Sequence, residues 1–368
     1  MTKNKRIGID ARMMYQTGVG VYIRNILFHL LQTTPEGVTY VVFARSEDWD
    51  RLKTEYAIAP RATEFVHSTA LWHSFSEQII FLWQLIVARL DVVHFPYFSW
   101  PVLYFRPFVA TIHDTILLTH ATGRASTLSP LWYKTKQLVF RWVIAEQAHR
   151  ARTILVPSES VRQEVVKVFP LIASKTLVTH EGVDALFART AVEQPRDFPY
   201  KTKQYFLYVG NCYPHKNVDV LLAAFAELVK THPDARLVLV GPDSVFAHTL
   251  KKSAQSMQSH SLWKHDVQVA ELKWLYTHAL SLVFPSKAEG FGLPILEAHS
   301  CGCPTILSDI SVFHEVAGSR ARYVVTGDSS DLCRAMQESM VQDTPVQDMK
   351  INPHFSFETL AAETQKIY

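Results

Sequence analysis

Short apolar runs alternate with longer segments of helical period along the first half of the chain. The segment 19–31 carries apolar residues at the spacing of one helix face. The apolar runs are 6–10, 38–44, 92–95, 109–113, 153–156 and 177–179. Because continuous apolar strands joined by helices are typical of parallel sheets covered on both faces, this half predicts a doubly wound α/β domain.

A second series of the same kind follows a polar, proline-bearing stretch at 190–203. Its expected elements are strands at 205–209, 236–240, 280–284 and 305–307, with helices at 218–229 and from Pro294. The last residues, 355–368, again have a helical pattern. We therefore expect two successive α/β domains, 1–189 and 190–352, and a closing helix within 353–368.

Composition narrows the class of protein. With 48% hydrophobic and 19% charged residues in 368, the chain has enough apolar material for two cores. Residues 1–186 hold 20 Lys and Arg against 15 Asp and Glu, and residues 187–368 hold 17 against 19. A net charge of +3 is too small to favour a nucleic-acid partner.

Cysteine usage and hydropathy predict where the protein works. Four cysteines in a chain of this length do not form a disulfide framework, and Cys301-x-Cys303 has no second pair that would complete a zinc site. The most apolar run, 79–88, is about half of the ~20 residues that a membrane-spanning helix needs, and the start of the chain lacks the order of a secretory signal. We expect a cytoplasmic protein.

The most informative segment links a buried strand to a helix that begins at Pro294. Its loop carries Gly290 and Gly292, and two glutamates eight residues apart, Glu289 and Glu297, stand in the loop and in the first helical turn. N–H groups at a helix start stabilise an anion such as pyrophosphate, and carboxylates accept hydrogen bonds from sugar hydroxyls. Taken alone, Glu289 is explained as a solvated loop charge and Glu297 as a complement to the helix dipole. The loop glycines, Pro294 and both glutamates together favour a functional site.

This segment resembles the E-x7-E signature of the retaining glycosyltransferases of family 4. Four other stretches are similar to that family's glycine-rich loop, strand-end histidine motif, donor-domain opening and crossover helix. They are Gly18-Val19-Gly20, His113-Asp114, residues 208–217 and residues 355–364. The resemblance spans nearly the whole chain. It implies the α/β GT-B fold, with two Rossmann-like domains, an interdomain cleft and a C-terminal helix that crosses back to the acceptor-binding N-terminal domain.

The resemblance also implies roles for individual residues. Glu289 is expected to bind the hydroxyls of the donor sugar, Glu297 the ribose, and Lys216 the diphosphate. A fixed cation stabilises the leaving group as its charge rises, so it can replace a metal ion. The expected catalytic residues are Glu289, His113 and Lys216. The expected donor-binding residues are Gly18, Gly20, Asn211, His215, Gly290, Phe291, Gly292, Leu293, Pro294 and Glu297. Neither a metal site nor a cofactor is expected.

The sequence departs from the family pattern at Asn211, where the family usually has arginine. Asparagine donates a hydrogen bond but carries no charge. The second positive charge must then come from His215 or from an arginine elsewhere, or Lys216 must neutralise more of the diphosphate charge. This departure keeps open a sugar-nucleotide-binding protein that has lost activity.

Two further motifs have alternative interpretations. The pair Gly18 and Gly20 invites a dinucleotide-binding interpretation, but it lies well downstream of Asp10 and position 23 is Ile, so a phosphate- or acceptor-facing loop is favoured. A lone histidine is usually structural. The position of His113 at a strand's carboxyl end favours a role in holding the donor sugar or the acceptor.

The helix expected at 131–150 has two distinct faces. Leu131, Thr135, Leu138, Val139, Trp142 and Val143 share one face, which is predicted to be core. Tyr133, Lys136 and Phe140 form an aromatic and basic stripe. The stripe predicts contact with an anionic membrane surface, binding of a lipid-phosphate acceptor, or an ordinary solvated face.

Together these features predict a retaining, metal-independent hexosyltransferase. The donor is expected to be a nucleotide sugar, GDP-mannose or a UDP-sugar. Overall resemblance to O-antigen and capsule mannosyltransferases favours mannose, with a glycan or lipid-linked acceptor. The rival from another class is a sugar-nucleotide epimerase of the same fold, which would need no acceptor.

Overall fold

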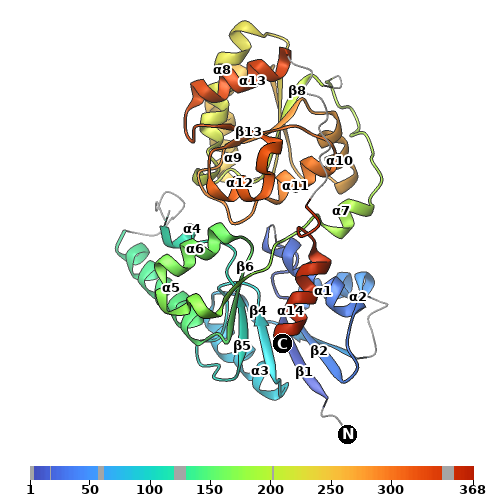
Figure 1. Cartoon of the computed structure of the whole chain (residues 1–368), viewed down its shortest axis with the longest axis vertical. Coiled ribbons are helices and arrows are strands. Elements are labelled where there is room, and N and C mark those ends of the chain that lie inside the picture. Colours follow the sequence, from blue (N-terminus) through green and yellow to red (C-terminus); the bar gives the residue numbers. More distant parts are fainter. Residues whose placement is uncertain (1–3, 17, 57–61, 120–129, 201–202, 342–351) are drawn as a thin grey trace. The chain divides into compact units, whose positions relative to one another are not determined.

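The computed structural model describes residues 4–16, 18–56, 62–119, 130–200, 203–341 and 352–368, without the side chains of 130–136 and 256 (Figure 1). Its contacts divide the chain into two compact units. Unit 1 comprises Met1–Glu181 with Ser356–Tyr368, and unit 2 comprises Gly182–Phe355.

The boundary before unit 2 lies at Glu181, earlier than the predicted 189. The cause is the short helix α7 (Ala185–Arg189), which belongs to the second unit. Its Phe187 is buried in the core of unit 2, and Lys273 Nζ donates to the carbonyl of Phe187 at 3.2 Å. The second boundary falls at 355/356 rather than 352/353, because Phe355 also packs in that core.

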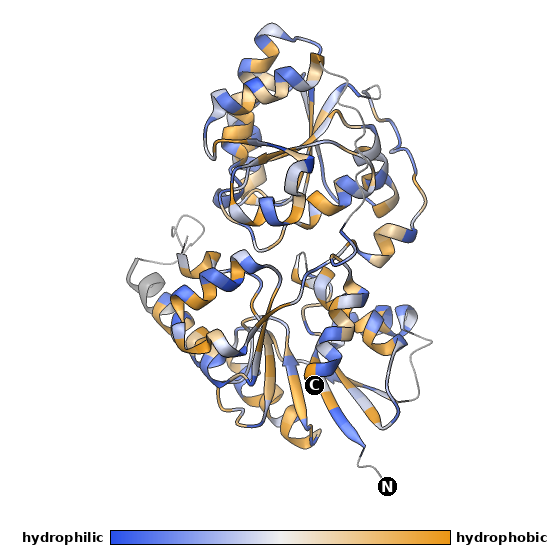
Figure 2. Ribbon diagram, in the orientation of Figure 1, coloured by the Kyte–Doolittle hydropathy of each residue, from blue (hydrophilic) through white to orange (hydrophobic). Residues whose placement is uncertain are grey.

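Among the described residues, unit 1 contains a seven-stranded parallel sheet in the order β3-β2-β1-β4-β5-β6-β7. Its strands are β1 (Lys5–Asp10), β2 (Val38–Arg45), β3 (Thr63–Ser68), β4 (Val92–Phe95), β5 (Phe108–Thr111), β6 (Thr153–Val156) and β7 (Thr176–Val178). Every residue of β4 and β5 is buried, and Figure 2 shows these strands as largely hydrophobic.

Helices cover both faces of this sheet. They are α1 (Val19–Gln32), α2 (Trp49–Glu55), a π-helix (Glu77–Phe81), α3 (Leu82–Val87), α4 (Ile116–Thr119), α5 (Pro130–Arg150), α6 (Glu159–Val168) and α14 (Phe357–Ile367). Helix α14 packs against α1, so the closing helix is part of unit 1. The π-helix, α3 and α5 pack in one hydrophobic core of this unit. Their buried side chains there include Phe81, Leu85, Ile144 and Ala148.

In the described part of unit 2, six parallel strands run in the order β10-β9-β8-β11-β12-β13. They are β8 (Tyr205–Val209), β9 (Arg236–Val240), β10 (Ser261–Lys264), β11 (Ser281–Phe284), β12 (Thr305–Ser308) and β13 (Ala321–Val324). The other helices are α8 (Val218–Thr231), α9 (Val245–Ser253), α10 (Val269–His278), α11 (Leu293–Ser300), α12 (Ser311–Ala317) and α13 (Ser329–Val341). The prediction of two doubly wound α/β domains is confirmed.

Helix α5 departs in part from the two faces that the sequence predicts for it. Val143 packs against the core as predicted. Three side chains predicted as core are exposed: Leu138, Val139 and Trp142. Phe140, predicted on the outward stripe, instead packs on the core, with its ring centroid 5.9 Å from that of Phe98. Ile144 and Ala148 set the buried line of the helix, and Phe140 lies on that line because it is one turn earlier.

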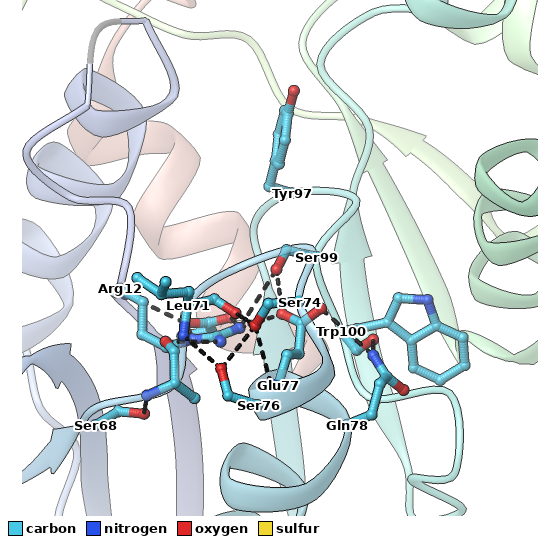
Figure 3. Close-up of polar contacts among 12 residues, drawn as sticks. Arg12, Ser68, Leu71, Ser74, Ser76, Glu77, Gln78, Tyr97, Ser99 and Trp100 are labelled. Atoms are coloured by element: carbon cyan, nitrogen blue, oxygen red, sulfur yellow. Dashed lines mark hydrogen bonds and ion pairs between the residues drawn. The ribbon is translucent and has the colours of Figure 1, made fainter. Parts of the chain in front are cut away.

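Arg12 is buried at the end of β1 between two carboxylates (Figure 3). Its Nη2 donates to Asp10 Oδ2 and to Glu77 Oε1, each at 2.7 Å. Ser99 Oγ also donates to Glu77 Oε1, and the guanidinium lies 3.6 Å from the ring centroid of Phe81. These contacts tie β1, the loop after β4 and the π-helix together. Burial raises the pKa of Glu77, so its charge depends on Arg12.

Replacing Arg12 with methionine should destabilise the protein by roughly 3–5 kcal/mol, because two buried carboxylates lose their cation. Urea unfolding followed by circular dichroism measures the change. The control is Arg51→Met, which breaks an exposed pair with Glu55 (2.8 Å) and should cost less than about 1 kcal/mol. Equal, small shifts in both variants would contradict a stabilising role for the triad.

Candidate active site

Two loops of unit 2 are neighbours at the carboxyl edge of its sheet, because they follow the paired strands β8 and β11. The N–H of Lys287 donates to the carbonyl of His215 at 2.8 Å. Asn217 Nδ2 donates to the carbonyl of Pro285 at 3.1 Å, and Asn217 adopts the left-handed conformation that starts α8. These bonds fix the spacing of the two loops before any ligand contributes.

Lys216 and Glu289, which the sequence assigns to the diphosphate and the sugar, contact each other directly. Lys216 Nζ donates to Glu289 Oε1 at 2.6 Å and to Oε2 at 2.8 Å. Ser286 Oγ donates to the same Oε1 at 2.6 Å. Their side chains are only 13% and 8% exposed, so water screens the pair weakly. The structure therefore holds a preorganised cation and carboxylate in one place.

The start of α11 requires a glycine. Gly292 has φ 102°, and a Cβ there would lie 3.0 Å from Ile295 Cδ1 and 3.3 Å from the Phe313 ring. The helix begins at Leu293, one residue before the predicted Pro294. Its first N–H groups point out of the helix end that follows β11, as an anion site at this edge needs.

Phe291 contributes its side chain to the fold rather than to a ligand. The ring is 3% exposed and meets the ring of Phe355 edge-on at 5.6 Å between centroids. Only its main chain is thus available for a donor. The use of this loop's main chain for the donor stays a prediction.

Glu297 projects from α11 and is bound by a residue of α10. Tyr276 Oη donates to Glu297 Oε2 at 2.8 Å. Burial raises the pKa of Glu297 to about 7, although the tyrosine hydrogen bond favours the ionised form. The carboxyl group thus changes its charge near neutral pH, and only its ionised form accepts hydrogen bonds through both oxygens.

Asn211 takes part in local turn structure. Its Oδ1 accepts the N–H of Tyr213 at 3.3 Å, and its carbonyl accepts the Tyr208 hydroxyl at 2.6 Å. The ring of His215 stacks on that of Tyr213, with centroids 5.9 Å apart. Asn211 therefore shapes the loop without supplying the charge of an arginine.

In unit 1, His113 follows β5 and is held between two oxygen acceptors. Its Nε2 lies 2.9 Å from the carbonyl oxygen of Pro96, and its Nδ1 lies 3.2 Å from Glu181 Oε1. Tyr22 packs edge-on against the ring at 4.7 Å. Both hydrogen bonds form together only with a doubly protonated imidazole or a protonated Glu181. The two contacts fix the orientation of the ring.

The two glycines after β1 also have structural reasons. Gly18 has φ 70° at the start of α1. A Cβ on Gly20 would lie 2.7 Å from the carbonyl oxygen of Met14, so that residue must be glycine for the loop to pack on the helix. Their identity therefore does not depend on a ligand.

Comparison with known proteins decides the family. A model described as "Glycosyl transferases group 1" matches residues 192–351, and the "Glycosyltransferase Family 4" model matches residues 16–185. The O-antigen chain mannosyltransferase RfbU of Salmonella typhimurium is 31% identical over 228 residues, which are 60% of this chain and 61% of that protein. The O-antigen chain mannosyltransferase B of Escherichia coli is 26% identical over 304 residues, 78% of this chain and 76% of that protein.

This chain belongs to the GT-B glycosyltransferases. The solved structure of Anabaena HepE in complex with UDP and glucose has the same fold, with a TM-score of 0.72 at 15% identity over 98% of both chains. At that identity the likeness supports the fold and nothing finer.

In this glycosyltransferase, the predicted site residues fall into two groups. Unit 2 brings together Lys216 and Glu289 and places the other donor-loop residues along the same sheet edge. Unit 1 holds Gly18, Gly20 and His113. Within the described ranges, no three His, Cys, Asp or Glu side chains gather as a metal ion would require.

Three contacts of this site were missed by the sequence analysis. Ser286 lies three residues before Glu289, so its proximity has a local signal. Glu181 lies in the loop that follows β7, and a polar residue after a strand was a usable signal. Tyr276 had none, because α10 meets Glu297 only through the tertiary fold.

Lys216→Met should weaken the binding of a nucleoside diphosphate to this glycosyltransferase by roughly tenfold or more, and that of the nucleoside only slightly, because the expected partner is phosphate. Isothermal titration calorimetry with both ligands measures the difference. Lys230→Met, which breaks an exposed pair with Glu227, is the control. If nucleoside and diphosphate weaken alike, Lys216 is a structural residue.

Proposed function

We propose that this glycosyltransferase is a retaining enzyme that transfers mannose from GDP-mannose to a glycan or lipid-linked acceptor without a divalent cation. The observation that carries the proposal is the Lys216–Glu289 pair beside the start of α11. A cation, a carboxylate and a helix N-terminus are the groups that a diphosphate-linked sugar needs.

Lys216 has the chemistry to assist departure of the nucleoside diphosphate. As the bond between the anomeric carbon and the phosphate oxygen breaks, negative charge grows on the phosphate. An ammonium held in a largely buried position stabilises that charge more in the transition state than in the ground state. Its contact with Glu289 orients the ammonium in advance, and Ser286 holds the Glu289 carboxylate in place by donating to it.

Glu289 and His113 are assigned to the sugar. Glu289 would accept hydrogen bonds from sugar hydroxyls, and His113 would hold the donor sugar or the acceptor. We assign no carboxylate as a covalent nucleophile. In this mechanism the acceptor oxygen attacks the face that the leaving group departs from, through an oxocarbenium-like transition state, and the configuration is retained.

The choice of mannose rests on the relatives. Both O-antigen chain proteins named above are described as mannosyltransferases, and each aligns with well over half of this chain. We therefore take the proposed donor base, sugar and acceptor from these relatives, and a UDP-sugar is the alternative donor.

We also propose that the enzyme works at the cytoplasmic face of a membrane. Its four cysteines are free, as in a reducing compartment. In the part of the chain that the structure describes, every helix is too short or too polar to span a bilayer. The predicted stripe does not carry this proposal, since Phe140 packs inward and the side chains of Tyr133 and Lys136 lie outside the described residues.

The deciding experiment supplies a panel of GDP- and UDP-sugars with and without acceptor glycans and measures released nucleoside diphosphate. We expect release from GDP-mannose that depends on acceptor, an α-linked product by NMR, and activity that persists in EDTA. Epimerised donor without any acceptor would support the epimerase instead. Loss of activity in EDTA with recovery in magnesium would overturn metal independence.

Glu297 gives a pH test of the ribose assignment. With its pKa raised to about 7, the carboxylate that accepts the ribose hydroxyls is lost as pH falls below 7. Nucleotide affinity of the wild type should therefore rise about tenfold between pH 6 and pH 8. Glu297→Gln is the reference, because the phosphate groups of the ligand titrate equally with both proteins. The tenfold rise is the part of the wild-type change that exceeds the change in this variant. Calorimetry at several pH values measures both proteins. Parallel pH profiles would remove Glu297 from the ribose site.

A further inference from the structure

The loop after β8 carries an aromatic side chain on the flank that faces away from Glu289. Lys216 reaches from this loop to Glu289, in the loop after β11, whereas the Tyr213 ring contacts Phe246 in α9, the helix after β9. Because β8 lies between β9 and β11 in the sheet, Lys216 and Tyr213 leave the loop on opposite sides. Tyr213 therefore stands beside the residues assigned to the diphosphate without taking part in the contacts assigned to the donor.

The Tyr213 ring is held in position although 46% of the residue is exposed. His215 stacks on the ring, with an angle of 24° between the planes and 5.9 Å between the centroids. Phe246 approaches at a steep angle, 69°, with its centroid 5.3 Å away. The N–H of Tyr213 also donates to Asn211 Oδ1 at 3.3 Å. A ring that is immobilised before a ligand arrives loses little conformational entropy on binding, so it is well suited to stack against a ligand.

A second exposed apolar side chain is next to Phe246 in the sequence. Val245, the first residue of α9, is 79% exposed. Among the large apolar side chains exposed in the described part of unit 2, Tyr213 is the only aromatic one. Apolar side chains exposed singly are ordinary, but these two and the partly buried Phe246 come together where the loop after β8 meets the start of α9. We call Tyr213, Val245 and Phe246 the Tyr213 platform.

Polar groups beside the platform fit a sugar. Asp243 precedes α9 and His248 lies in its first turn, and His248 Nε2 is 2.8 Å from Asp243 Oδ1. Both side chains are more than half exposed, so they can also form hydrogen bonds with the hydroxyls of a ligand. A pyranose presents a face of C–H groups, which packs on an aromatic ring, and a rim of hydroxyls, which bonds to such side chains. One acid and one histidine do not attract a strongly charged partner, so a neutral glycan fits this surface.

The proposed retaining reaction limits where the acceptor lies. Its oxygen attacks the face from which the diphosphate departs, so the acceptor approaches beside the phosphate, to within about 3 Å of the anomeric carbon. In unit 2 the phosphate is assigned to Lys216 and to the start of α11, and the donor sugar is assigned to Glu289. The flank of the Lys216 loop that faces away from Glu289 is therefore next to the phosphate but outside the contacts of the donor sugar. The Tyr213 platform occupies this flank.

We propose that the Tyr213 platform binds a sugar unit of the acceptor glycan, the unit behind the one that reacts. The inference deepens the proposed function and rests on it, because attack beside the leaving phosphate is what gives the acceptor its place. The reacting hydroxyl lies at the phosphate itself, and the platform begins on the next flank of the loop, so it meets the following sugar. That sugar packs its C–H face on Tyr213, while Asp243 and His248 bond to its hydroxyls.

The test compares acceptors of increasing length, with GDP-mannose as the donor. Wild type and Tyr213→Ser are assayed for released GDP with methyl α-mannoside, α-mannobiose and α-mannotriose. The variant should raise KM for the two longer acceptors about tenfold, because one stacked aromatic ring is lost, and KM for methyl α-mannoside less than about twofold. Tyr213→Phe keeps the ring and should match wild type. Saturation-transfer NMR with mannotriose measures binding apart from turnover.

Two further variants control the result, and thermal unfolding checks that every variant is folded. Val245→Ser leaves the rings of Tyr213 and His215 in contact and should raise the same KM values by a smaller factor. Val325→Ser removes an exposed valine elsewhere in unit 2 and should have no effect. Equal KM increases for all three acceptors, an unchanged KM in Tyr213→Ser, or the same loss in Val325→Ser would overturn the proposal. A matching loss of GDP affinity by calorimetry would also overturn it, because Tyr213 would then belong to the donor site.

Binding and turnover together separate this inference from the proposed function. If mannotriose binds to wild type and more weakly to Tyr213→Ser, but no donor is turned over, the platform stands and the proposed function fails. If GDP-mannose is turned over with KM values that do not depend on Tyr213, the proposed function stands and the platform fails. Failure of mannotriose to bind to wild type, with or without GDP, also overturns the platform.

Discussion

The parallel direction of every paired strand is the constraint on which the rest of this molecule depends. Parallel strands put all their carboxyl ends, and the starts of the helices that follow, on one edge of each sheet. Lys216 and Glu289 are 73 residues apart in sequence, yet they meet because β8 and β11 are neighbours. In unit 1 the same rule puts Gly18, after β1, and His113, after β5, on a common edge.

That constraint also explains which parts of the fold the sequence predicts. Inner strands such as β5 and β11 are buried along their whole length, and their sequences are mostly apolar. The strands that the sequence analysis missed, β3, β10 and β13, lie at sheet edges. Their residues are mostly half-buried, so polar side chains interrupt the pattern. Helix α5 failed for a related reason: several apolar residues are exposed, and hydropathy alone does not choose the buried face.

The candidate site was predictable in its members but less so in its contacts. The E-x7-E segment and the Lys216 motif are local in sequence, and their residues lie where the strands end. The bond of Tyr276 to Glu297 joins two helices and leaves no trace in either segment. The pairing of Lys216 with Glu289 needed the strand order, because residue spacing says nothing about which loops are neighbours.

Each unit contains a cluster of a cation, a carboxylate and a serine hydroxyl, but the two clusters have different roles. Arg12 with Glu77 and Ser99, and Lys216 with Glu289 and Ser286, each join a cation to a carboxylate that also accepts a serine hydroxyl. The Arg12 side chain is fully buried and bridges two acids, so its charge is balanced within the fold. The Lys216 side chain keeps 13% of its surface exposed, and Glu289 occupies two of the three N–H donors of an ammonium. A cation balanced by two buried acids can only hold structure together, whereas one that meets a single acid near the surface retains the capacity to bind a second anion.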